Sequence, residues 1–463
     1  MLRERVRQGD HLVVALSGGL DSVVLLHLLV PLSTRMAFRL SAVHVDHGIS
    51  PNAGKWGTFC HELCQGLGVS LKVRRLKINR EPGASLEAAA REGRYRVFAA
   101  VDADYVVLGQ HQDDQAETLL LQLLRGAGVK GLAAMPVIRI LPPAEGLVPE
   151  VESRASANGP CDGPRILRPL LDASRSEIED YARENGLRWI TDESNDDVSF
   201  DRNFLRREVL PLLEKRFPAY RATFSRASRH MAEASGLLDE LAEADGTARL
   251  FAEELHIEDL RRLSLPRARN LLRYTLSQRG VVLPSTVKLD DILRQLMSSH
   301  CDAKLHVIFG DVEVRCFRGV IHVRKAGKLF SRALREAEAP VASIAWRGES
   351  ELNLPHLGGI LSFRRENTAG KESAIELAKL LEQPVTIRMR QGGERLRPDC
   401  NRPRRSLKNL LREASLPPWE REVLPLIFSG DQLVCVPGIG TDCAFQAASG
   451  EPGLLAQWRR TEP

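Results

Sequence analysis

The stretch His11-Leu-Val-Val-Ala-Leu-Ser-Gly-Gly-Leu-Asp-Ser-Val-Val-Leu-Leu-His27 places two apolar runs on either side of a Ser-Gly-Gly turn. The first run, residues 12–16, predicts a fully buried parallel strand, and residues 22–29 predict the helix that follows it. Gly18 and Gly19 carry no side chain, so backbone N–H groups can approach an anion at the positive end of that helix. The turn therefore predicts a phosphate-binding site.

Hydroxyl and carboxylate groups complete this turn. Ser17 and Ser22 supply hydroxyl donors, and Asp21 is suited to hold a magnesium ion (Mg2+) that bridges phosphate oxygens. The spacing and the lysine of a Walker loop are missing. The segment Ser17-Gly-Gly-Leu-Asp-Ser22 instead resembles the PP-loop signature of the ATP pyrophosphatases, which cleave ATP between its α- and β-phosphates. The resemblance implies that ATP contacts Ser17, Gly18, Gly19, Leu20, Asp21 and Ser22, whereas the alternative is a turn without a ligand.

Length and composition describe a protein of several domains. A chain of 463 residues exceeds one compact core, and 43% hydrophobic with 27% charged residues is ordinary for a soluble globular protein. No apolar run approaches the roughly 20 residues of a membrane span, and we expect no signal peptide. Eight scattered cysteines without a Cys-x-x-Cys motif argue against a disulfide scaffold or a metal site. They indicate buried thiols in a reducing cytoplasm.

The positive charge of the chain is concentrated in one run. The net charge is only +5, but residues 388–412 carry eight arginines and one lysine against two carboxylates. A block of this density is either a solvated surface or a binding site for a polyanion.

Strands and helices alternate downstream of the turn. Strands are expected at residues 40–48, 69–76 and 105–108, and helices at residues 54–66 and 86–103. This alternation predicts an α/β fold with a doubly wound parallel sheet. Ligands of such sheets bind beyond the carboxyl ends of the strands. That rule selects the loops that begin at Ser17, His44 and Gly109.

The loop at Gly109 leads into a helix that begins with carboxylates. Asp113 and Glu117 are four residues apart, so they share one face of the first turn, where the helix dipole favours negative charge. Alone, this pattern also fits an N-capping cluster. Together with the Gly-Gly turn and Asp46 at a neighbouring strand end, it predicts a functional site.

The rest of the chain predicts a mixed middle region and a separate C-terminal α+β module. Ser174 and Glu177 form a capping box for a helix that ends near Asn185. The other expected segments are an exposed insertion (142–164), helices (220–278, 290–297 and 406–414), a hairpin (304–310 with 312–323), a linker (332–340) and strands (385–389 and 433–436). The expected domains are residues 1–217, 218–331 and 341–463.

Eleven short motifs are spread along the chain: Ser17-Gly-Gly-Leu-Asp-Ser22, His44-Val-Asp-His-Gly48, Glu87 with Ala90-Arg91-Glu-Gly-Arg94-Tyr95, His111-Gln-Asp-Asp-Gln-Ala-Glu-Thr118, Leu124-Arg-Gly126, Arg168-Pro-Leu-Leu171, Asp192-Glu-Ser-Asn195, Arg202-Asn203 with Arg206, Gly392-Gly-Glu-Arg395, Ser406-Leu-Lys408 and Pro417-Pro-Trp-Glu-Arg421. Together they resemble the motifs of the bacterial tRNA(Ile)-lysidine synthases. The resemblance implies a cytoplasmic carbon–nitrogen ligase that uses ATP and Mg2+ to join free L-lysine to C2 of the wobble cytidine in the CAU anticodon of tRNA(Ile). An adenylated tRNA would be the intermediate, and AMP and pyrophosphate would be released. A homodimer is compatible with this resemblance.

The resemblance also implies roles for the matched residues and domains. Asp21 would bind magnesium, and the expected catalytic residues are Asp46, His111, Asp113, Asp114, Glu117 and Arg125. Which carboxylates hold lysine and which hold magnesium stays open, and His111 is either a proton acceptor or a loop histidine that donates to a carbonyl. The expected tRNA-binding residues are Arg202, Arg206, Arg388, Arg395, Arg402, Arg404, Arg405 and Lys408. The first domain would bind ATP and catalyse, and the mainly helical second and α+β third domains would bind tRNA.

Two other function classes remain as alternatives. A PP-loop tRNA thiolase would deliver sulfur, but such enzymes commonly need paired cysteines near the loops, and the chain has no Cys-x-x-Cys. A non-catalytic RNA-binding protein with a vestigial nucleotide fold would be expected to lose carboxylates that are costly to cluster. Retention of Asp21, Asp46, Asp113 and Glu117 argues against that reading.

Overall fold

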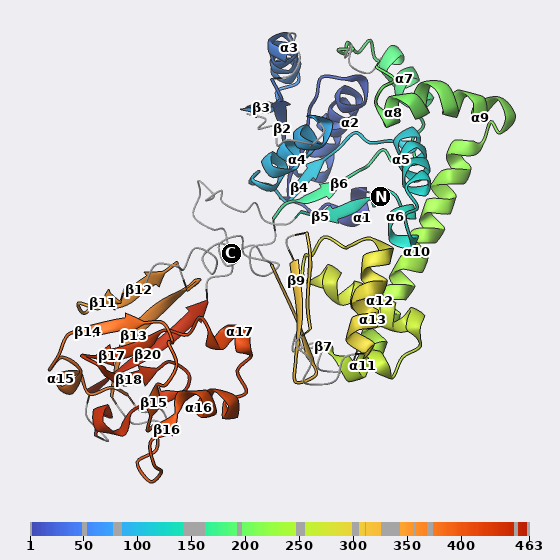
Figure 1. Cartoon of the computed structure of the whole chain (residues 1–463). Coiled ribbons are helices and arrows are strands. Elements are labelled where there is room, and N and C mark those ends of the chain that lie inside the picture. Colours follow the sequence, from blue (N-terminus) through green and yellow to red (C-terminus); the bar gives the residue numbers. More distant parts are fainter. Residues whose placement is uncertain are drawn as a thin grey trace. The chain divides into compact units, whose positions relative to one another are not determined.

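The computed structural model describes residues 2–48, 53–76, 86–141, 163–191, 197–246, 255–298, 305–310, 312–325, 343–355, 357–367, 374–448 and 452–460 (Figure 1). The chain separates into two compact units, Met1–Leu238 and Asp239–Pro463, and each is described by itself. Most of the expected insertion, residues 142–162, lies outside the described residues, and so does the expected linker at residues 332–340.

The first unit is built on a six-stranded sheet with the order β3-β2-β1-β4-β6-β5 (Figure 1). Its strands are β1 (His11–Ala15), β2 (Arg39–Asp46), β3 (Ser70–Arg75), β4 (Tyr105–Val107), β5 (Ile138–Ile140) and β6 (Arg165–Leu167). Neighbouring strands from β3 to β6 pair in parallel, whereas β5 pairs antiparallel with β6 at the edge. The predicted parallel sheet is confirmed, and the antiparallel edge strand is an addition that the sequence pattern did not reveal.

Helices cover both faces of this sheet, as expected of a doubly wound fold. Leu12 of β1 packs in a cluster with Val23 of α2 (Leu20–Met36) and Cys60 of α3 (Ala53–Gly66). The next residue, Val13, packs with Phe98 of α4 (Leu86–Ala99). Successive side chains of a strand point to opposite faces, so burial on both sides requires the continuous apolar run seen in the sequence.

The remaining helices of the first unit are α1 (Leu2–Arg5), α5 (Gln112–Leu124), α6 (Val129–Leu132), α7 (Arg175–Glu184), α8 (Asp201–Phe204), the π-helical η2 (Leu205–Val209), α9 (Leu210–Arg216) and α10 (Tyr220–Asp245), whose last residues belong to the second unit. Among them, α5 and α7 bring polar residues to the carboxyl edge of the sheet. The capping box predicted for α7 is confirmed: the Glu177 N–H donates to Ser174 Oγ at 3.3 Å and the Ser174 N–H to Glu177 Oε2 at 2.7 Å.

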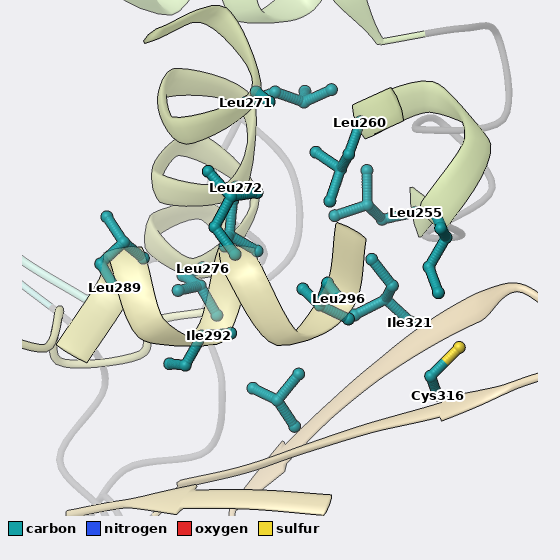
Figure 2. Close-up of a cluster of buried hydrophobic side chains, with 14 of the residues drawn as sticks. Leu255, Leu260, Leu271, Leu272, Leu276, Leu289, Ile292, Leu296, Cys316 and Ile321 are labelled. Carbon is teal, nitrogen blue, oxygen red and sulfur yellow. The ribbon is translucent and has the colours of Figure 1, made fainter. Parts of the chain in front are cut away.

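The second unit begins with a helical layer packed on an antiparallel sheet of order β7-β10-β9-β8. Figure 2 shows its core, in which leucines of the helices face Cys316 and Ile321 of the sheet. Its elements are α11 (Ile257–Arg261), α12 (Leu265–Gln278), α13 (Thr286–Ser298), β7 (Leu255–His256), β8 (His306–Phe309), β9 (Val312–Phe317) and β10 (Val320–Lys325). The prediction of one strand over residues 312–323 was wrong, because Arg318 and Gly319 adopt positive φ angles of 50° and 81° and turn the chain.

The C-terminal part of the second unit is an α+β structure, as predicted. One sheet has the order β11-β14-β17-β18-β19, a second β12-β13-β20, and β15 pairs with β16. The elements are β11 (Ile344–Ala345), β12 (Glu351–Leu354), β13 (Gly359–Asn367), α15 (Leu377–Leu380), β14 (Val385–Arg388), β15 (Arg395–Leu396), β16 (Arg405–Ser406), α16 (Leu407–Glu413), α17 (Pro418–Arg421), β17 (Leu426–Ser429), β18 (Gln432–Val436), β19 (Gly440–Thr441), the 3-10 turn η4 (Cys443–Phe445) and β20 (Pro452–Arg460).

Cysteine usage differs in part from the sequence expectation. Cys60 and Cys64 are free and buried, which confirms the expected buried thiols. Cys400 and Cys443 form a disulfide with their Cα atoms 5.6 Å apart. Forty-three residues separate this pair along the chain, so cysteine spacing could not reveal it.

Candidate active site

The Ser-Gly-Gly turn between β1 and α2 has the geometry of an anion site. Gly18 adopts a φ of +88°, which favours glycine, and the backbone N–H of Gly19 donates to Ser17 Oγ at 3.3 Å. Ser22 Oγ lies 3.1 Å from Ser17 Oγ and donates to the carbonyl of Gly19 at 3.0 Å. Helix α2 begins at Leu20 with no side-chain cap from Gly19, so its first-turn amides keep their capacity to bind an anion.

Gly109, in the loop after β4, packs directly against the start of α2. A Cβ atom at this position would lie 2.8 Å from the carbonyl oxygen of Asp21 and 3.2 Å from the nitrogen of Ser22. Both contacts are to backbone, so a side chain would have to displace the start of α2. Sequence reasoning selected the Gly109 loop by its place at a strand end and did not foresee this close approach.

We expect Gly109→Ala to impair ATP use by up to about 10²-fold in kcat/KM, because displacing a reacting group by about 1 Å can cost that much. Steady-state AMP formation would measure the change. Gly54→Ala is the matched control, since a Cβ at Gly54 meets nothing within 4 Å. Equal activity of both variants would contradict the importance of this packing.

His111 lies at the centre of a group of carboxylates. The residue is 1% exposed. Its Nε2 lies 3.6 Å from Asp21 Oδ1 and 3.5 Å from Asp114 Oδ2, and its Nδ1 lies 3.6 Å from Asp113 Oδ2. These separations are long for hydrogen bonds, so the contacts are electrostatic. Burial alone would lower the pKa of His111, but the three carboxylates outweigh it and raise the pKa above its ordinary value.

The carboxylates differ in how they are held. Burial raises the pKa of Asp21, although His111 and Arg175 oppose that effect. Burial would likewise raise the pKa of Asp113, but the neighbouring His111 and hydrogen bonds from the Arg175 backbone and Arg221 hold it well below its usual range. The Arg221 Nε donates to Asp113 Oδ1, and the same guanidinium donates to Glu214 Oε1 at 2.6 Å. Asp113 is therefore a firmly ionised group fixed between α7 and α10.

Arg202 and Arg206 bind the carboxylates of α5. Arg202 Nη2 donates to Asp114 Oδ1 at 2.7 Å and its Nε to Glu117 Oε2 at 2.6 Å. Arg206 Nε donates to Glu117 Oε1 at 2.6 Å and its Nη2 to Glu117 Oε2 at 3.0 Å. We expected both arginines to contact tRNA. That expectation stays a prediction; in this structure their guanidinium groups bind Asp114 and Glu117.

Two further expected catalytic residues lie outside the group around His111. Arg125 follows the last residue of α5, about 18 Å from the first turn at 1.5 Å per residue. Its Nη2 pairs with the exposed Asp201 at 3.0 Å, and its expected role as a phosphate-stabilising cation stays a prediction. Asp46, at the end of β2, accepts from the Gly48 N–H at 2.8 Å and lies 3.6 Å from the exposed Arg75 Nε. Unlike Asp113, Asp114 and Glu117, it accepts no arginine hydrogen bond of normal length from the described part of the chain.

The expected tRNA-binding residues of the C-terminal module fall into two sets. Arg388 is tied to Thr386 and Phe428, Arg404 pairs with Asp442 at 3.0 Å, and Arg405 pairs with Glu413. The second set is exposed and has no buried partner among the described residues: Arg395, Arg402 and Lys408. Arg404 is exposed as well, but Asp442, its partner, is buried. Arg402 pairs with the partly exposed Asp399 at 3.3 Å and remains 67% exposed.

Two kinds of feature are absent from the described residues. No cluster of three or more histidine, cysteine, aspartate or glutamate side chains there is arranged to hold a metal ion. Across the same part of the chain, no helix combines the length and apolar character needed to cross a membrane.

Family models match three segments of the chain. They are described as "PP-loop domain" over residues 2–213, "TilS substrate binding domain" over residues 255–322 and "TilS substrate C-terminal domain" over residues 385–458.

Curated relatives match the chain almost from end to end. The tRNA(Ile)-lysidine synthase of Nitrosomonas europaea is 52% identical, covering 100% of this chain and 94% of the relative. The enzyme of the same name from Azoarcus sp. is 38% identical, covering 97% of this chain and 92% of the relative. That of Coxiella burnetii is 36% identical, covering 95% and 91%. At this identity and coverage, the chain belongs to the tRNA(Ile)-lysidine synthase family.

Proposed function

We propose that this protein is a ligase that attaches free L-lysine to C2 of the wobble cytidine in tRNA(Ile) with a CAU anticodon, using ATP and releasing AMP and pyrophosphate. The observation that carries the proposal is the 52% identity to a tRNA(Ile)-lysidine synthase over 461 residues. The phosphate-binding turn and the carboxylates around His111 are the site at which this chemistry would take place.

The first half-reaction converts a poor leaving group into a good one. The C2 oxygen of the cytidine attacks the α-phosphorus of ATP, and the turn from Ser17 to Ser22 holds the phosphates in line through backbone N–H groups and hydroxyls. Asp21 fits a magnesium ligand, since its Oδ1 is buried and has no hydrogen-bond partner among the described residues. A single carboxylate suffices when phosphate oxygens complete the coordination, and bound magnesium would neutralise phosphate charge.

The second half-reaction needs a pocket for lysine. The ammonium groups of lysine call for carboxylates, and the candidates for binding lysine or magnesium are Asp46, Asp113 and Asp114. Asp46 is proposed to bind lysine, because its Oδ2 lies 3.6 Å from Arg75 Nε and makes no hydrogen bond of normal length to that group. Glu117 and the arginines that bind it would support the first turn of α5. His111 is proposed as the group that holds or accepts a proton between these carboxylates.

The thiolase alternative is disfavoured by the thiol nearest to the turn. Cys60 Sγ would lie 3.2 Å from a Cβ at Gly18, so this thiol is adjacent to the phosphate site. Burial raises the pKa of Cys60 to about 12, which leaves it protonated and unreactive at neutral pH.

Incubation with ATP, lysine and an unmodified tRNA(Ile) transcript tests the proposed function. We expect one AMP and one lysidine per tRNA, measured by nucleotide chromatography and nucleoside mass analysis. AMP formation that depends on a sulfur donor would support the thiolase alternative. Tight tRNA binding without ATP turnover would support a non-catalytic RNA-binding protein.

The exposed cations of the C-terminal module are proposed to contact tRNA phosphates. We expect Arg395→Ala/Arg402→Ala/Lys408→Ala to weaken tRNA binding and to reduce the magnitude of its salt slope by roughly 0.7–0.9 for each lost phosphate contact. Measuring the tRNA dissociation constant at several salt concentrations between about 50 and 200 mM would give both the affinity and its salt slope. Arg183→Ala is a control, since this exposed arginine lies on α7 of the first unit. An unchanged slope in the triple variant would identify residues 388–412 as a solvated surface.

The three expected domains are also part of the proposal. Residues 1–217 would bind ATP and catalyse, and residues 218–331 and 341–463 would bind tRNA. The three matched segments, 2–213, 255–322 and 385–458, support this division because each falls within one proposed domain.

A further inference from the structure

The start of α7 is fixed beside the phosphate-binding turn. Leu20 and Val24 of α2 form a buried cluster with Ile178 and Ala182 of α7. This packing joins the first turns of α2 to α7 along most of the length of α7. It makes α7 a rigid support for side chains that face the turn.

Hydrogen bonds join the start of α7 to the start of α5 as well. The Gln112 N–H donates to the carbonyl of Ala173 at 2.8 Å, and the Arg175 N–H donates to Asp113 Oδ2 at 3.0 Å. The capping box of α7 fixes the backbone immediately before Arg175. The positive ends of α2, α5 and α7 therefore converge near one another, which favours an anion among them.

Arg175 places a guanidinium at this convergence. Its Nη1 lies 3.5 Å from Asp21 Oδ1, and its Nε donates to Glu179 Oε1 at 3.1 Å. The side chain remains 41% exposed and Asp21 31% exposed. Arg175 thus contacts the phosphate-binding turn while part of its side chain stays accessible to a ligand.

We propose that Arg175 binds the β- and γ-phosphates of ATP and stabilises the leaving pyrophosphate. This inference rests on the proposed adenylation. When the cytidine C2 oxygen bonds to the α-phosphorus, the bond from that phosphorus to the bridging oxygen breaks, and its electron pair passes to pyrophosphate. The turn has no Walker lysine to meet this charge. A guanidinium supplies paired donors that match phosphate oxygens, so Arg175 can stabilise the negative charge that develops on pyrophosphate.

Variants of Arg175 separate a phosphate contact from a structural role. Arg175→Met removes the charge, Arg175→Lys keeps a charge without the planar fork, and the backbone N–H to Asp113 survives in both. Arg183→Met is the matched control, because Arg183 Nη2 pairs with the same Glu179 at 3.4 Å but lies two turns along α7. Arg183→Met should leave the rate of AMP formation and the affinity for pyrophosphate unchanged.

The decisive measurements concern pyrophosphate. We expect Arg175→Met to lower kcat for AMP formation about 10²-fold, as the loss of one stabilising donor does in other active sites. Inhibition by added pyrophosphate should weaken about tenfold or more, the KM for lysine should stay within twofold, and Arg175→Lys should recover part of the rate. Direct titration of the full-length protein with pyrophosphate should show the same loss of affinity.

The outcomes distinguish this inference from the proposed function. Should Arg175→Met match Arg183→Met in rate and in pyrophosphate affinity, Arg175 has no phosphate contact. A wild-type protein that forms no AMP with tRNA(Ile) would overturn the proposed adenylation instead. In that case the pyrophosphate titration still decides whether Arg175 binds phosphate groups.

Discussion

Gly19→Val should reduce AMP formation by about 10³-fold or more while the protein stays folded, since blocking even one preorganised donor can cost 10²–10³-fold. Gly19 has φ −73° and ψ 162°, angles that any residue adopts. A Cβ atom there would lie 3.4 Å from Ser17 Oγ, which is an ordinary contact. The backbone need not move, but the added methyl groups would stand among the amides and hydroxyls that face the phosphates.

Two comparison variants make this result specific. Gly19→Ala adds only the Cβ and should lose less activity than Gly19→Val. Gly54→Val adds the same side chain to a position with nothing within 4 Å and should leave ATP turnover unchanged. Rates of AMP release at saturating tRNA and lysine, with circular dichroism to verify folding, provide the test. Wild-type turnover by a folded Gly19→Val variant would remove the phosphate-binding assignment of the turn.

The sequence predicted this turn because its signals are local. Continuous apolar runs mark β1 and β2 as strands buried on both faces, and adjacent glycines mark the turn. The capping box of α7 is likewise contained within four residues. The strands, the turn and the capping box were predictable because residues close together in the sequence determine each of them.

Long-range pairing of charges was not predictable in the same way. Arg202 lies 85 residues from Glu117, and no periodicity relates the two positions. A basic segment in a tRNA-dependent family suggested phosphate contacts, whereas the fold turns these guanidinium groups onto buried carboxylates. Arg175 was overlooked for a related reason: the capping box accounts for its surroundings in sequence, and only the packing of α7 on α2 brings it to Asp21.

Glu117 gives the second large effect. Its side chain is 1% exposed, and both of its oxygens accept hydrogen bonds from Arg202 and Arg206. Glu117→Gln keeps the volume but removes one of the two buried carboxylates that balance these guanidinium groups, so that Asp114 alone remains. Removing one member of a buried pair costs about 3–5 kcal/mol, and we expect about 3 kcal/mol here because the two arginines are 28% and 37% exposed.

Loss of this anchor should loosen the first turn of α5 and thereby stop product formation. Hydrogen exchange of α5 peptides measures the local opening directly. Glu92→Gln is the matched control, since Glu92 pairs with Arg96 on the exposed face of α4 and its loss should cost under about 1 kcal/mol.

Steady-state kinetics then distinguish two roles of Glu117: holding α5 in place, or contacting the lysine substrate directly. Because arginines already occupy both oxygens of Glu117, we expect Glu117→Gln to lower kcat for lysidine formation and to leave the KM for lysine within about twofold, the pattern of a lost interaction that is not part of ground-state binding. A lysine KM raised more than about tenfold, with unchanged exchange of α5, would instead make Glu117 a lysine ligand. That outcome would require Arg202 and Arg206 to release the carboxylate when lysine binds.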